Sequence, residues 1–224
     1  MVNARLYVLC PDVEARERAL HEYTKPWEVP IVIPQTSWLE SIMYVSELMS
    51  RYDEWRDMDY VGCISHTAHT KQPGIHDIED LLKESRAQGS DIVAFLPGGY
   101  RDIVLNGEQY HPGFQRAWNE TWTYLGFDQE RMSEPCFSFF CNYWCATPEF
   151  MTFYCSLFSY FHHRLERTPS WKRTLWTNAR YRGSIPPDTL RTLFGVPYYP
   201  LLPFVAERMI CPFAKEFAIK GTSL

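Results

Sequence analysis

The fold is indicated most directly by residues 59–65, which have the sequence DYVGCIS. This short, mainly apolar run predicts a buried strand. Similar runs stand at residues 5–10 (RLYVLC), 31–34 (IVIP) and 91–97 (DIVAFLP). Segments with helical spacing of apolar residues separate them. This alternation predicts an α/β fold with a mainly parallel central sheet that helices cover on both faces.

The remaining residues predict a helical second half. We expect one domain over residues 1–224, in which residues 1–100 form the sheet and residues 101–224 form a part that caps it. The turn signals Gly98-Gly99 and Asn106-Gly107 predict a loop over residues 98–110. The helices expected along the whole chain span 12–23, 37–55, 77–88, 112–125, 148–167, a segment opened by Pro169, and 201–218.

Composition excludes several classes of protein. The chain has 224 residues and a formal net charge of −5, which argues against a basic nucleic-acid binder. No apolar run approaches the roughly 20 residues that span a bilayer, so no transmembrane segment is expected. The first residues do not resemble a signal peptide. The seven cysteines form no C-x-x-C pair, and their odd number together with the missing signal peptide favours reduced thiols in a cytoplasm-like compartment.

Polar residues follow the third predicted strand, where an open parallel sheet binds its ligands. Ser65 ends this strand, and His66, His69 and Lys71 follow it; this set is typical of contacts to an anionic ligand. A metal site formed with His76 is an alternative for the two histidines.

Acidic residues flank the predicted strands. Asp57 and Asp59 form a D-x-D triplet, which can chelate Mg²⁺ or Mn²⁺ on a nucleotide diphosphate. The alternative is a helix-to-strand turn with a solvated Asp57. Asp91 opens the fourth strand, either as a catalytic or metal-binding carboxylate or as a capping residue. The chain lacks G-x-G-x-x-G, P-loop and G-x-S-x-G motifs.

Three stretches together resemble one family. Residues 46–66 contain a Glu-Leu pair, a tyrosine and a tryptophan, then D-Y-V-G and a histidine. Residues 140–150 are similar to an N-[MY]-[FW] strand that leads into a helix, and residues 204–209 to a terminal helix with the sequence E-R-L. This pattern resembles the exopolysaccharide-synthesis glycosyltransferases of bacteria and viruses. The chain is also similar to the small GT-A domains with which large algal viruses decorate capsid glycans.

The resemblance implies a GT-A-like fold, a nucleotide-diphosphate sugar donor, with a UDP-sugar favoured, and a glycan or glycoprotein acceptor. It implies Mn²⁺ or Mg²⁺ as a possible cofactor, and host cytoplasm as the location if the protein is viral. Where the family has H-Y-R-R, this chain has residues 66–69, HTAH. His69 and Lys71 are therefore expected to replace two arginines as cations for the diphosphate.

Candidate site residues follow from these motifs. A carboxylate or histidine must deprotonate the acceptor hydroxyl if the anomer inverts. Arg208 is expected near the diphosphate with Glu207 fixing it, or the two form a helix-internal ion pair. The candidates are Asp91, His66 and Asp102 as catalytic residues; Asp59, Ser65, His66, His69, Lys71 and Arg208 for the donor; Asn142, Trp144, Tyr143 and His111 for the acceptor; and Asp57 with Asp59 for a metal.

Two other functions stay open on the sequence. A non-catalytic carbohydrate-binding module would use the aromatic residues, which make up 16% of the chain. A metal-dependent hydrolase would use His66, His69 and His76 with an aspartate.

Overall fold

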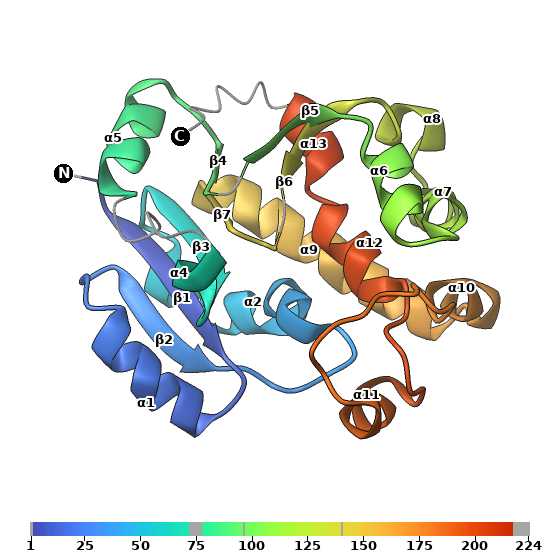
Figure 1. The fold of residues 1–224 in the computed structure, drawn as a ribbon. Helices are drawn as coiled ribbons and strands as arrows, with labels where there is room; N and C mark the ends of the chain where they lie inside the picture. The colour runs from blue at the N-terminus through green and yellow to red at the C-terminus, as the bar shows by residue number, and fades with distance from the viewer. Residues whose placement is uncertain (1, 72–77, 96, 140, 217–224) are drawn as a thin grey trace.

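A five-stranded sheet forms the centre of the molecule, with strand order β2-β1-β3-β7-β4 (Figure 1). The computed structural model describes residues 2–71, 78–95, 97–139 and 141–216. β1 pairs in parallel with both β2 and β3, and β7 lies antiparallel between β3 and β4. The prediction of a mainly parallel sheet is confirmed. The strands are β1 (Ala4–Cys10), β2 (Glu28–Val32), β3 (Tyr60–Ser65), β4 (Ile92–Ala94) and β7 (Trp144–Ala146).

Helices cover both faces of this sheet. One face packs against α1 (Val13–Glu22) and α5 (Glu79–Ala87). The other packs against the helical turns of residues 39–55 and against α9 (Pro148–Glu166). Because both faces are covered, every residue of β3 is buried.

The prediction of one continuous helix over residues 37–55 is wrong. The segment consists of η1 (Leu39–Ser41), a π-helical turn η2 (Met43–Glu47), α2 (Leu48–Ser50) and α3 (Tyr52–Trp55). Tertiary contacts override the helical pattern here. The hydroxyl of Tyr44 lies 3.1 Å from the sulfur of Cys63 on β3, and the indole of Trp55 donates to the carbonyl of Leu48 at 2.8 Å. Such π turns are frequent at functional sites.

The second half adds a small sheet and more helices. β5 and β6 pair antiparallel, and the largest hydrophobic cluster runs from Tyr7 to Phe213. The two halves therefore share one core as well as one sheet. No helix among the described residues is long and apolar enough to cross a membrane. The added elements are β5 (Pro97–Arg101), α6 (Ile103–Tyr110), α7 (Phe114–Leu125), α8 (Gln129–Met132), β6 (Cys136–Phe139), α10 (Pro169–Leu175), α11 (Pro187–Phe194), α12 (Leu202–Arg208) and α13 (Cys211–Glu216).

Two further predictions of secondary structure are wrong. Residues 98–110 form β5 and α6 instead of a loop. Asp102 caps α6 by accepting hydrogen bonds from the backbone N–H groups of Val104 and Leu105 at 2.9 and 2.8 Å. Gly107 lies inside this helix. A larger residue would not fit there, because the ring of Phe114 fills the space that a Cβ atom would need.

The helix predicted over residues 201–218 is divided into α12 and α13. Pro212 occupies the second position of α13, where a residue without a backbone N–H is tolerated. If α12 continued through Pro212, the helix would lose the backbone hydrogen bond that an N–H group at this position would donate.

Candidate functional site

A cavity of about 610 Å³ lies where β1, β2 and β3 end. Its floor and one wall come from the first half of the chain, including Leu9, Ile33 and residues 65–67. The opposite wall comes from the second half, from Tyr181, Ser184 and Ile185 and from α12. In Figure 1 the arrowheads of these three strands point to one edge of the sheet. A ligand there would contact both halves.

His66 follows β3 directly and borders the cavity. Its Nδ1 atom lies 3.2 Å from the carbonyl oxygen of Leu9. Because a carbonyl only accepts, Nδ1 is the donor in this contact. The backbone is fixed as well, since the hydroxyl of Tyr23 donates to the carbonyl of His66 at 3.1 Å. Thus Leu9 on β1 orients this imidazole, and Tyr23, the residue after α1, holds the backbone that carries it.

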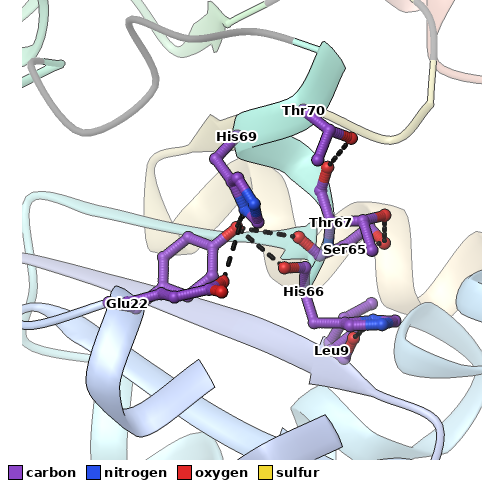
Figure 2. A network of polar contacts seen from close by, with 8 residues as sticks. Leu9, Glu22, Ser65, His66, Thr67, His69 and Thr70 are labelled. Atoms are coloured by element: carbon purple, nitrogen blue, oxygen red, sulfur yellow. Dashed lines mark hydrogen bonds and ion pairs between the residues drawn. The ribbon is translucent and has the colours of Figure 1, made fainter. Parts of the chain in front are cut away.

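His69 faces away from the cavity. It lies in α4 (Ala68–Lys71), a short helix in place of the predicted loop, and its Nδ1 is 3.5 Å from Glu22 Oε2 and 3.4 Å from the hydroxyl of Tyr23. Figure 2 shows the rings of His66 and His69 pointing in different directions. The side chain of Lys71 and all of His76 lie outside the described residues.

The predicted metal ligands do not come together. Among the described residues, no group of three or more His, Cys, Asp and Glu side chains could hold a metal ion. The triplet of Asp57 and Asp59 precedes β3, whereas the cavity lies where β3 ends. Asp59 Oδ2 accepts from the backbone N–H of Asn3 at 2.7 Å and pairs with Arg86 at 2.8 Å, while Asp57 is exposed.

Asp91 also lies at the edge opposite the cavity. β3 and β4 are both antiparallel to β7, so their amino ends share one edge. Asp91 immediately precedes β4, and its carbonyl accepts from the backbone N–H of Thr147 at 2.9 Å. Asp102 caps α6 and borders a separate surface groove. Of the predicted catalytic residues, His66 alone borders the cavity.

Asn142 borders the cavity from the turn before β7. Cys141 and Asn142 both have left-handed backbone conformations, with φ of 61° and 55°. Asparagine tolerates this region better than most residues, and such strain is frequent at binding sites. The turn is held by Glu207, whose Oε1 accepts from the backbone N–H of Cys141 at 2.6 Å. The Oδ1 atom of Asn142 is buried and has no hydrogen-bond partner in the described part of the chain.

The two residues that follow Asn142 do not line the cavity. Tyr143 and Trp144 point to opposite faces of the sheet and belong to the two hydrophobic clusters. Trp144 stacks on Tyr44, with ring centroids 5.3 Å apart. Successive side chains of an extended segment alternate between faces. Of the four predicted acceptor residues, Asn142 is the one that the structure brings to the cavity.

Glu207 and Arg208 point in different directions from α12. Arg208 is 6% exposed, and its guanidinium lies 5.5 Å from the ring centroid of Phe114 and 3.2 Å from the carbonyl of Phe204. A guanidinium nitrogen of Arg208 lies 3.8 Å from Glu207 Oε2, so the two residues form the ion pair that was predicted as the alternative to donor binding. Glu207 borders the cavity instead, because adjacent helical residues do not share a face.

Sequence reasoning missed most of the second wall. It is aromatic and includes Tyr181, Tyr199 and Phe204, with Trp38 across from them. Tyr181 and Tyr199 lie in irregular segments, where no periodicity marks a binding role. Glu207 was visible in the E-R motif, but one sequence does not show which of the two residues faces a ligand.

His111 is buried behind the cavity and carries a pH-dependent prediction. Its ring stacks on Phe204 at 3.8 Å, and burial, reinforced by Arg208, lowers the pKa of His111 to about 4. In the unfolded chain His111 binds a proton near pH 6.5, whereas in the folded protein it does so only near pH 4. The free energy of unfolding is therefore highest above pH 6.5 and falls as the pH decreases toward 4. We expect a loss of roughly 2 kcal/mol between pH 7 and pH 4.5 from this residue.

The measurement is urea unfolding at several pH values for the wild type and for His111→Gln. The difference between their slopes isolates this histidine from other groups. Parallel pH profiles would contradict the prediction.

The structure thus brings Ser65, His66 and Asn142 of the predicted residues to one cavity, together with Glu207. The chain matches no protein-family model, and comparisons with curated proteins and with solved structures find no match.

Proposed function

We propose that the chain is a glycosyltransferase with a GT-A-like fold. It would move a sugar from a nucleotide-diphosphate sugar, with a UDP-sugar favoured, to a glycan or glycoprotein acceptor in this cavity. The observation that carries the proposal is that His66, Asn142 and Glu207 border one cavity. Each comes from a different one of the three stretches that resemble the family, although these stretches lie far apart in sequence.

The two walls suit two substrates. The strand ends offer the hydroxyls of Ser65 and Thr67 and the imidazole of His66. Such groups hydrogen-bond to phosphate oxygens, so we assign the donor to this wall. The opposite wall offers the rings of Tyr181 and Phe204, whose flat apolar faces can pack against sugar rings. We assign the acceptor to that side.

The charge of the cavity supports a role for Mn²⁺ or Mg²⁺. Its described lining contains the carboxylates of Glu40 and Glu207 and no lysine or arginine. A diphosphate beside these carboxylates needs a cation to offset the repulsion. Glu40 and the Oδ1 atom of Asn142, which has no partner among the described residues, both border the cavity and would hold such an ion, because Mg²⁺ is commonly held by one or two protein oxygens and substrate phosphates. When bound, the ion would neutralise charge on the leaving diphosphate.

His66→Ala is expected to reduce sugar transfer roughly 100-fold, because it removes a preorganised polar contact at the donor. The readout is release of nucleoside diphosphate, with a radiolabelled donor to confirm transfer. His163→Ala, which changes an exposed histidine on α9, is the control. Unchanged turnover of the His66 variant, with both variants folded, would reject the assignment.

A carbohydrate-binding module is the second candidate, and the aromatic wall favours it. A thermal-shift titration with UDP, GDP and Mn²⁺ separates the two functions. A transferase should be stabilised by a nucleoside diphosphate with the metal, whereas a binding module should respond to glycans alone. A cytoplasmic location belongs to the same proposal, since no disulfide joins any two of the seven cysteines.

A further inference from the structure

We infer that Glu207 is the general base that deprotonates the acceptor hydroxyl, and that transfer therefore inverts the anomeric configuration. The inference rests on the proposed glycosyltransferase function and adds to it a catalytic residue and a stereochemical outcome.

The carboxylate of Glu207 is fixed and still accessible. Its side chain is 20% exposed and borders the cavity. Oε1 accepts from the backbone N–H of Cys141 at 2.6 Å, so the turn before β7 holds a residue of α12 in place. Arg208 lies 3.8 Å from Oε2 and contacts the carboxylate from the buried side. A base held in this way loses little entropy when it meets its substrate.

The position of Glu207 on α12 matches the acceptor wall. Phe204 and Glu207 are three residues apart and therefore share a helical face, and both border the cavity together with Pro203. A sugar ring packed against Phe204 would present its hydroxyl groups along this face of the helix. His66 and Ser65 lie at the strand ends on the other side of the cavity, where the donor is assigned.

The other acidic candidates are placed less well for this role. Asp91 and Asp102 do not border the cavity. Glu40 does, but it comes from η1 in the first half of the chain. The proposed function assigns Glu40 to the cation, so Glu207 is the carboxylate of the described cavity lining that remains for the acceptor hydroxyl.

The step is a single displacement. The O–H bond of the acceptor breaks and its proton moves to the carboxylate of Glu207. The oxygen's electron pair forms the new bond to the anomeric carbon, while the bond from that carbon to the diphosphate oxygen breaks and its electron pair leaves with the diphosphate. The proton is later released to water. Because attack comes from the face opposite the leaving group, the configuration at the anomeric carbon inverts.

The first test is Glu207→Gln, which keeps the shape and an acceptor for the Cys141 N–H but removes the basic carboxylate. Transfer is expected to fall roughly 100-fold or more. Affinity for UDP with Mn²⁺, measured by calorimetry, is expected to stay within about threefold, since the base does not bind the donor. Formate added to Glu207→Ala is expected to restore part of the rate. Glu149→Gln, an exposed change on α9, is the matched control.

The second test is the anomeric configuration of the wild-type product, read from its proton NMR coupling constants, and it needs no variant to fold. An inverted product with a slow Glu207→Gln variant supports the inference. A retained product, or Glu207→Gln activity above about one third of wild type, overturns it while the proposed function stands. Absence of both transfer and donor binding in the wild type would overturn both proposals.

Discussion

Trp144→Ala is expected to lower the free energy of unfolding by about 4 kcal/mol. Trp144 is fully buried, and its indole stacks on Tyr44 at 5.3 Å and meets Tyr154 edge-on at 5.1 Å. Truncation would leave a large cavity between the sheet and α9, because the surrounding rings cannot collapse into it. Urea unfolding followed by far-UV circular dichroism measures the change.

The same variant separates a core role from the acceptor-binding role that the sequence predicted for Trp144. Tyr110→Ala, which truncates a ring that is 62% exposed, is the control and should change stability by less than about 1 kcal/mol. Wild-type stability in Trp144→Ala, combined with lost glycan binding, would contradict the buried placement.

Gly62→Ala is expected to destabilise the protein by about 3 kcal/mol through overpacking. Gly62 lies on β3 directly opposite Cys145 of β7. A Cβ atom at Gly62 would lie 2.6 Å from the Cβ of Cys145 and closer still to the carbonyl oxygen of Trp144. Neither strand can move away within the sheet, since β3 also pairs with β1 and β7 also pairs with β4. Thermal and urea unfolding of the purified variant measure the effect.

Gly89→Ala is the matched control for Gly62→Ala. Gly89 has a φ of +67°, and a Cβ atom added there would meet no other atom of the described residues within 4 Å, so this variant isolates backbone strain from steric conflict. Its expected cost is about 1 kcal/mol. Equal stability of Gly62→Ala and wild type would show that β3 and β7 do not pair in this register.

Local patterns predicted much of the fold. The four apolar runs overlap β1 to β4, although β2 begins earlier and ends earlier than the run at residues 31–34, and the spacing of apolar residues after Pro148 corresponds to α9. β7 was not predicted as part of the main sheet. It has only three residues, and it forms because β3 and β4, distant in sequence, both pair with it. Such long-range pairing leaves no local periodicity in the sequence.

The candidate site was predicted less completely. Ser65 and His66 were expected at the carboxyl end of β3 and lie there, because strand direction fixes which edge they reach. Asp59 and Asp91 precede their strands and so lie at the opposite edge. The sequence also does not show which side of α12 each residue occupies. Glu207 borders the cavity while Arg208 is buried, and this depends on how α12 packs against Phe114.

The most direct measurement is a crystal structure of the protein soaked with UDP-glucose and Mn²⁺. The proposal predicts electron density for the diphosphate in the cavity between residues 65–67 and α12, beside the imidazole of His66. Density for the nucleotide on another surface, such as the groove beside Asp102, would contradict it.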